Sequence, residues 1–387
     1  MKKLIFALCL FAHFVNAQTN ISLKRLDNSS ILTSKLTQNL QRIVDSGHIA
    51  GLSVAVINHN DIVYTQCFGE KYKATHQALD RETIMYAASF TKPVFSYLFL
   101  KLVDSGVFDL DKPIYIYLKK PIGAYPKWAT LRHEANFEKI TPRMILSHSS
   151  GLPILRYINN NDVDSLFLVA KPTKQFFYSN EGMNLLGFVV EEYTGKTLDS
   201  LAQELIFTPL SMPHSGMVWH KRFDQNLAFG YDANDTLIGA IKKTSARGAG
   251  SMVTTATDYA QFVKAMLKKQ GLSPKMGAEM FKPQMQVRSL RGFGSQNATL
   301  TTQNEAIQLS WGLGWGLFQT AKGAAFFHSG HTSGWQNYCL AYPEQGIAVV
   351  LMSNSDNFER NLAAILKDTV GDVDSPLAWI GIYDVQK

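Results

Sequence analysis

The chain has 387 residues, of which 46% are hydrophobic and 18% are charged. This composition is typical of a globular protein with a large core and excludes a disordered chain. The formal net charge is +7, and the sequence contains no nucleic-acid-binding motif, no paired C-x-x-C and no H-E-x-x-H. It therefore predicts neither a nucleic-acid partner nor a metal or other cofactor.

The first 17 residues have the pattern of a secretory signal peptide. Two lysines, Lys2 and Lys3, precede an apolar core at residues 4–14, and small residues at 15–17 suit a cleavage site. The core is too short to span a membrane, and no later stretch reaches about 18 apolar residues. We expect a secreted or periplasmic protein with residues 18–387 as a single domain. The alternative is an uncleaved anchor.

The first part of the mature chain predicts a helix followed by a hairpin. Leu36, Leu40 and Ile43 recur at helical spacing and are followed by glycines. Residues 52–57 and 62–67 are apolar or β-type and are separated by turn residues, which predicts two antiparallel strands. An apolar run at residues 93–103 then predicts a buried helix that ends near residue 106.

The middle and the end of the chain differ in pattern. Residues from about 106 to 250 are mostly helical in pattern, whereas the C-terminal part alternates β-type runs with turns. The predicted strands are residues 313–318, 325–329, 335–342 and 347–352, and a closing helix covers 358–369. We expect these strands and the N-terminal hairpin to form one antiparallel sheet. The α/β part then spans about 33–105 and 250–370, with the helical part between.

A S-x-x-K tetrad opens the apolar helix that follows the hairpin. If the helix starts at Ser89, the serine lies at its positive end, and Lys92 shares its face and can take or relay its proton. The simple alternative is a helix-capping serine followed by a solvated lysine. A S-x-x-K tetrad is expected by chance about once in a chain of this length. The tetrad therefore becomes informative only in combination with other motifs.

Two further motifs follow in order. Tyr178-Ser179-Asn180 lies 89 residues after Ser89, and His328-Ser329-Gly330 lies 150 residues after Tyr178. Residues 147–153, between the first and second motifs, read S-H-S-S-G-L-P. Residues 248–258, between the second and third motifs, include G-A-G-S-M followed by Thr255 and Asp258.

With these segments, the chain resembles the serine β-lactamase and D-Ala-D-Ala peptidase superfamily in its class C-like branch, which includes family VIII-type esterases and D-aminopeptidases. The resemblance runs from about residue 33 to about residue 370. It implies an α/β (α+β) fold of the β-lactamase/transpeptidase type. In that fold a five-stranded antiparallel sheet is flanked by helices, an all-helical region is inserted, and the active site lies between them. It also places Cys67 and Cys339 on strands that are not neighbours, so we expect two buried free thiols.

The resemblance assigns Ser89 as the nucleophile of an acyl transfer. Either Lys92 deprotonates Ser89 directly, or it holds Tyr178 partly ionised so that the phenolate takes the proton. The sequence leaves this choice open. Asn180 is expected to bond to a substrate amide and to brace Lys92.

The third motif is expected to bind the substrate. The backbone N–H groups of Ser89 and His331 would form the oxyanion hole, and Ser329 could contact a substrate carboxylate beside Gly330. His328 stands where class C β-lactamases carry lysine. A histidine near pKa 6.5 is mostly neutral at pH 7.5, so the site would depend less on a carboxylate, or bind it better in mild acid. The alternative is a strand histidine bonded to backbone.

We therefore expect a secreted serine hydrolase that forms an acyl-enzyme at Ser89 and acts on a small-molecule or peptide substrate. A peptidase of the D-Ala-D-Ala carboxypeptidase or D-aminopeptidase kind, or an esterase, is the first interpretation. A class C-like β-lactamase is the next, because β-lactams are also candidate substrates. A non-catalytic penicillin-binding domain and an unrelated binding protein with chance motifs are the remaining alternatives. The sequence leaves the natural substrate and the oligomeric state open.

Overall fold

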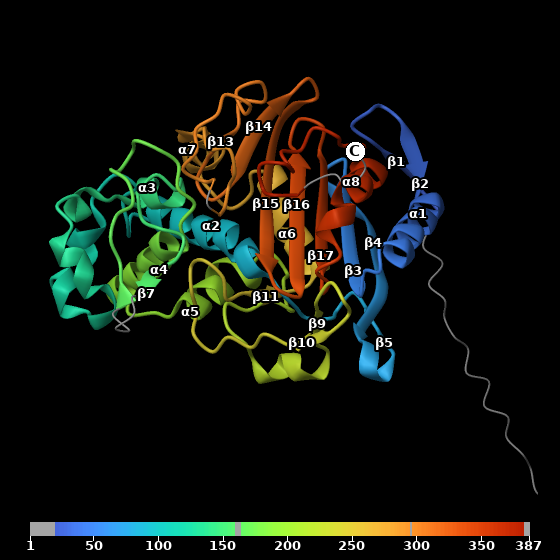
Figure 1. Cartoon of the computed structure of the whole chain (residues 1–387), viewed down its shortest axis with the longest axis horizontal. Helices are drawn as coiled ribbons and strands as arrows, with labels where there is room; N and C mark the ends of the chain where they lie inside the picture. Colours follow the sequence, from blue (N-terminus) through green and yellow to red (C-terminus); the bar gives the residue numbers. More distant parts are fainter. Residues whose placement is uncertain (1–19, 159–163, 295, 383–387) are drawn as a thin grey trace, which may run out of the picture.

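A computed structural model describes residues 20–158, 164–294 and 296–382. The predicted signal peptide at residues 1–17 lies outside the described residues. In Figure 1 a sheet with its covering helices occupies one half of the molecule, and a mostly helical region occupies the other.

The sheet has nine strands in the order β12-β13-β14-β15-β16-β17-β3-β4-β5, and every neighbouring pair is antiparallel. Five adjacent strands have seven residues or more: β15 (Gly323–Thr332), β16 (Trp335–Tyr342), β17 (Ile347–Ser353), β3 (Gly51–Asn58) and β4 (Asp61–Tyr72). Shorter strands extend both edges: β12 (Met285–Gln286), β13 (Ser310–Trp311), β14 (Gly316–Thr320) and β5 (Gln77–Ala78). The expected fold class and the N-terminal hairpin are confirmed, and the strand predicted at residues 313–318 corresponds to β14. Strands β12, β13 and β5 were not predicted, so the sheet is wider than the five strands that the resemblance implied.

Both faces of the sheet are buried. Along β17, Val350 and Met352 join one hydrophobic cluster, whereas Val349 and Leu351 join the other, because successive side chains point to opposite faces. The helix on the first face is α6 (Ala256–Leu267), and those on the second are α1 (Thr33–Ser46) and α8 (Leu362–Val370). A strand buried on both sides reads as a continuous apolar run, which is why residues 347–352 were recognisable.

In its described part, the region between residues 106 and 250 contains no strand of the nine-stranded sheet, but the expectation that it is all-helical is only partly confirmed, because short strands and long loops lie among its helices. It contains α3 (Pro142–Leu146), α4 (Asn180–Thr194) and α5 (Leu198–Ala202), with several 3₁₀ turns between residues 114 and 139. The remaining elements are short: β1 (Ser22–Lys24), β2 (Ser30–Leu32), β6 (Met85–Tyr86), β7 (Tyr157–Ile158), β8 (Asp164–Ser165), β9 (Gly230–Tyr231), β10 (Leu237–Gly239), β11 (Val253–Thr254) and α7 (Pro274–Met280). Whether the whole mature chain behaves as one domain stays a prediction.

Helix α2 (Thr91–Asp104) runs between the sheet and the helical region (Figure 1). It is buried along most of its length and ends at Asp104, with Ser105 as its C-cap, close to the end that the apolar run predicted. The helix begins two residues later than expected, because Ser89 lies in a 3₁₀ turn, Ala88–Phe90, that precedes it. Neither α2 nor any other helix in the described part of the chain has the length and apolar character needed to cross a membrane.

Of the three cysteines, Cys67 and Cys339 lie within the described residues, on β4 and β16 with β17 and β3 between these strands, and both are free thiols. The expectation that Cys67 and Cys339 lie on strands that are not neighbours is confirmed. Cys339 is buried, but Cys67 is only partly buried, because it lies on β4, towards the edge of the sheet.

Candidate active site

The turn that carries Ser89 is fixed by the segment at residues 249–252. Ala88 has a left-handed backbone, with φ of 47°, and its carbonyl accepts a hydrogen bond from the Thr91 hydroxyl at 2.7 Å. The same hydroxyl accepts the backbone N–H groups of Ser251 and Met252, each at 3.2 Å. The N-cap residue of α2 is Phe90, and no side chain caps the helix. The interpretation of Ser89 as a helix cap is therefore wrong, and its hydroxyl is available for another use.

Lys92 is fully buried, one turn after Ser89. Its Nζ donates to Ser89 Oγ at 2.9 Å and to the Ala249 carbonyl oxygen at 2.8 Å. Burial holds the pKa of the Lys92 amine well below its ordinary value, because an ammonium ion is poorly solvated there. The alternative of a solvated lysine is wrong. A neutral amine this close to a hydroxyl can accept its proton.

Tyr178 lies beside this pair, just before α4. The Lys92 Nζ is 4.7 Å from the centre of the Tyr178 ring. Burial raises the pKa of the Tyr178 phenol, and the Ser89 hydroxyl opposes this shift only in part. The Ser89 hydroxyl is close enough to influence the Tyr178 pKa, but the buried Tyr178 hydroxyl makes no hydrogen bond of ordinary geometry within the described residues. Tyr178 is therefore a phenol, and the expectation that Lys92 keeps it partly ionised is not supported.

Asn180 is the first residue of α4, which Ser179 caps by accepting the Gly182 N–H at 2.8 Å. The buried Asn180 Oδ1 makes no hydrogen bond to any described residue, and the two hydrogen bonds of Lys92 go to Ser89 and Ala249. The expected brace from Asn180 to Lys92 is therefore not formed.

A residue that the sequence analysis missed supports Lys92 instead. Asn184, one turn further along α4, accepts the Ala249 N–H with its Oδ1 at 3.2 Å. Because the Ala249 carbonyl accepts from Lys92, Asn184 fixes a segment that holds the amine. The two residues are 65 positions apart in the chain, so no local pattern signalled this contact.

His328 lies on β15 with its ring centre 6.3 Å from that of Tyr178 and 5.7 Å from that of Trp311. Its Nδ1 donates to the Ser329 carbonyl oxygen at 2.7 Å, and its Nε2 has no partner among the described residues. The interpretation as a strand histidine bonded to backbone is confirmed for Nδ1, whereas a role of the ring in binding the substrate stays a prediction. Burial, and then the nearby Lys92, lower the pKa of His328 to about 3. The expected gain of charge in mild acid is therefore wrong.

The end of β15 passes close to the Ser89 turn. A Cβ atom on Gly330 would lie 2.6 Å from the Ala87 carbonyl oxygen, so only glycine fits without a shift. Ser329 is partly buried, and the exposed His331 imidazole pairs with Glu359 at 3.0 Å. His331 thus directs its side chain to the surface, and any role it has at the site falls to its backbone. The oxyanion hole stays a prediction.

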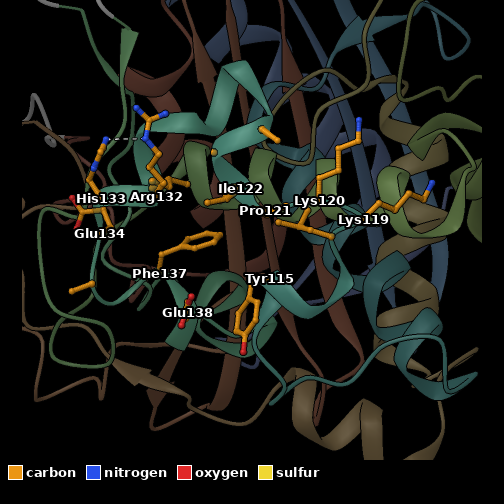
Figure 2. A pocket seen from close by; sticks show the side chains of 15 residues that line it. Tyr115, Lys119, Lys120, Pro121, Ile122, Arg132, His133, Glu134, Phe137 and Glu138 are labelled. Atoms are coloured by element: carbon orange, nitrogen blue, oxygen red, sulfur yellow. Dashed lines mark hydrogen bonds between the residues drawn. The ribbon is translucent and has the colours of Figure 1, made fainter.

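The site is separate from a cavity of about 890 Å³ in the helical region (Figure 2). That cavity is lined by residues between 115 and 138, among them Tyr115, Ile122, Arg132 and Phe137, and none of the predicted site residues borders it. The geometry instead links Ser89, Lys92, Tyr178 and His328 through the contacts described above. Chance motifs on an unrelated fold would not meet in this way, so that alternative is wrong.

The comparisons with known proteins agree with this arrangement. The chain is 24% identical over 360 residues to unguisins hydrolase ungD' of Aspergillus campestris, covering 86% of this chain and 63% of that protein. It is 22% identical to penicillin-binding protein 4 of Amycolatopsis lactamdurans, over 84% of this chain and 86% of that protein. The structure of the octameric penicillin-binding protein homologue from Pyrococcus abyssi shares the fold, with a TM-score of 0.69 and 22% identity over 87% of this chain and 79% of that one.

The chain spans slightly less than two thirds of the Aspergillus protein, and 64% of protein flp from Staphylococcus aureus. A family model described as beta-lactamase matches residues 36–370, which is most of the chain and contains every predicted site residue. This protein belongs to the beta-lactamase family.

Proposed function

We propose that this protein is an exported serine hydrolase that forms an acyl-enzyme at Ser89 and cleaves an ester or amide bond. The observation that carries the proposal is the 2.9 Å contact between Ser89 Oγ and the amine of the fully buried Lys92. Burial favours the neutral amine, which is the form that can accept the serine proton. The names of two relatives, a hydrolase and a penicillin-binding protein, are in keeping with it.

In the proposed acylation, Lys92 takes the proton from Ser89 as Oγ attacks the substrate carbonyl carbon. When the tetrahedral intermediate collapses, the bond to the leaving group breaks, and the Tyr178 phenol donates its proton to the departing oxygen or nitrogen. The Lys92 ammonium then returns a proton to Tyr178, which restores both groups. Because burial lowers the pKa of Lys92 and raises that of Tyr178, the lysine is present as a neutral amine that can accept a proton, and the tyrosine as a phenol that can donate one.

In the proposed deacylation, a water molecule attacks the acyl carbon of the acyl-enzyme. The neutral Lys92 accepts a proton from this water, either directly or through Tyr178, and the proton then passes back to Ser89 Oγ as the acyl bond breaks. The acid product leaves, and Ser89, Lys92 and Tyr178 regain their starting states.

The environment of His328 favours a peptidase or an esterase over a β-lactamase. A lysine at this place would present a permanent cation to a substrate carboxylate, whereas the buried His328, with its pKa of about 3, is neutral at physiological pH. A substrate that depends on a cation there would lose a charge-assisted hydrogen bond.

The proposal is tested by measuring the hydrolysis of a short-chain aryl ester, a D-amino-acid anilide, a peptide ending in D-Ala-D-Ala and a penicillin, with wild type and Ser89→Ala. We expect turnover of the ester or of one of the two peptide-type substrates, lost in Ser89→Ala. Fast turnover of the penicillin alone would favour the β-lactamase alternative. A penicillin adduct with no turnover of any substrate would favour the non-catalytic penicillin-binding domain.

Export is a separate part of the proposal and rests on the pattern of residues 1–17 alone. N-terminal sequencing of the protein recovered from outside the cytoplasm should begin at Gln18. An intact Met1 on the recovered protein would contradict cleavage at this site.

A further inference from the structure

We propose that His148 is a positioning residue that holds Tyr178 in place for proton donation to the leaving group. The inference rests on the proposed function, because it gives a partner to the tyrosine of that mechanism. His148 lies in the loop after α3, 30 residues before Tyr178, and the sequence analysis gave it no role of its own.

His148 pins the backbone on both sides of Tyr178. Its carbonyl oxygen accepts the N–H of Phe177 at 2.8 Å, and its Nδ1 accepts the N–H of Ser179 at 3.1 Å. The two residues that flank Tyr178 are thus bonded to one histidine. Together with the hydrogen bonds that the Ser179 hydroxyl makes to Pro153 and Gly182, these two bonds limit how far the Tyr178 side chain can move.

The imidazole of His148 also packs against the phenol ring. The two ring centres are 4.3 Å apart, and the planes are tilted by 38°. His148 is 1% exposed, and its ring centre lies 5.3 Å from that of Trp311. Tyr178 is therefore in contact with His148 as well as with the Lys92 amine.

The hydrogen bonding fixes the protonation state of His148. An Nδ1 atom that accepts a backbone N–H carries no proton, so the neutral ring has its proton on Nε2. Burial, together with Lys92 and His328, keeps the pKa of His148 well below its ordinary value. A neutral ring leaves Nδ1 able to accept the Ser179 N–H.

The backbone of His148 restricts which residues could replace it. Its φ is +54°, in the left-handed region that histidine and asparagine tolerate better than most side chains. In asparagine, Oδ1 is attached to Cγ as Nδ1 is in histidine, so it can accept the Ser179 N–H from a similar place. In glutamine the acceptor is one bond further out. His148→Asn and His148→Gln therefore both lose the ring but differ in the acceptor position and in how well they tolerate this φ; urea unfolding of both variants measures the second difference.

The test compares two esters with the same acyl group, one with a p-nitrophenol and one with an alkyl alcohol as leaving group. The alcohol needs a proton as it departs, whereas p-nitrophenolate is stable without one. The measurement is kcat/KM, which reports acylation, for wild type, His148→Asn, His148→Gln and Tyr178→Phe, with active enzyme counted by the burst of p-nitrophenol. We expect His148→Gln to lose about tenfold more kcat/KM on the alkyl ester than on the aryl ester, in the same direction as Tyr178→Phe. In His148→Asn the ratio of kcat/KM on the two esters should return most of the way to its wild-type value.

Equal losses on both esters in His148→Gln would overturn the proposal, because they would mean that His148 only supports the fold. The same holds if His148→Asn and His148→Gln behave alike on both esters. Failure of the proposed function looks different, since wild type would then hydrolyse neither ester faster than Ser89→Ala. If His148→Gln does not fold, a leaving-group difference in His148→Asn of the full Tyr178→Phe size contradicts the role given to Nδ1, and a smaller one supports it.

Discussion

Gly330→Ala tests how closely β15 must approach the Ser89 turn. The added Cβ would lie 2.6 Å from the Ala87 carbonyl oxygen, 0.8 Å less than the 3.4 Å at which ordinary contact begins. The obstacle is backbone, so it cannot be relieved by a rotamer change, and either β15 or the turn must move. The backbone φ of Gly330 is not in the left-handed region, so the effect is steric.

We expect the clash in Gly330→Ala to cost about 1–3 kcal/mol of unfolding free energy, as other overpacked sites do. A shift of nearly 1 Å between Ser89 and β15 should lower kcat/KM for an aryl ester about 100-fold. The assay pairs urea unfolding with ester hydrolysis. Gly277→Ala is the matched control, because a Cβ on this helical glycine of α7 meets nothing within 4 Å. Gly277→Ala should keep full activity, and its free energy of unfolding should rise by up to about 1 kcal/mol. Wild-type activity and stability in Gly330→Ala would refute the reasoning.

Three further predictions concern buried titratable side chains. Lys92→Met should lower kcat/KM at least about 100-fold, because it removes the base, and retained activity would contradict the role of Lys92. The same substitution should not lower stability in urea, because methionine replaces a poorly solvated amine with an apolar side chain. Because the pKa of His328 is about 3 in the folded protein and 6.5 in its ordinary state, the unfolded chain binds more protons between these values. Wild type should therefore lose stability as the pH falls from about 6.5 to 3, and His328→Gln should lose less over this window; an equal slope would refute the assignment. Arg156 and Glu181 pair at 2.8 Å with side chains 12% and 9% exposed, so Glu181→Gln should cost about 3 kcal/mol in urea unfolding; a change below about 0.5 kcal/mol would contradict it.

Much of the fold was predictable because its signals are local. The strand at residues 347–352 is buried on both faces and reads as an apolar run, and the hairpin turn at His59 and Asn60 has left-handed residues suited to a tight turn. Strands β12, β13 and β5 have two residues each, too few for a period to be seen, so the sheet is wider than expected.

Motif spacing and resemblance identified the predicted site residues, but the pKa values of their side chains in the folded protein could not be predicted from the sequence. A sequence carries the ordinary pKa of His328, whereas the folded value depends on burial between elements far apart in the chain. The same is true of Lys92, whose hydrogen bond to Ala249 joins residues 157 positions apart. The contacts of His148 with the neighbours of Tyr178 are likewise set by tertiary packing, which the S-H-S-S-G-L-P segment does not reveal.

The most direct test of the central claim is the intact mass of the protein over time after mixing with a penicillin or a slowly hydrolysed ester, followed by digestion and peptide mapping, for wild type and Ser89→Ala. The account predicts that wild type gains the mass of one acyl group on the peptide that contains Ser89, and that Ser89→Ala gains none. Persistence of the adduct would indicate a penicillin-binding peptidase, and rapid decay an efficient hydrolase of that compound. An adduct of equal yield on Ser89→Ala, or on a different peptide, would contradict Ser89 as the nucleophile.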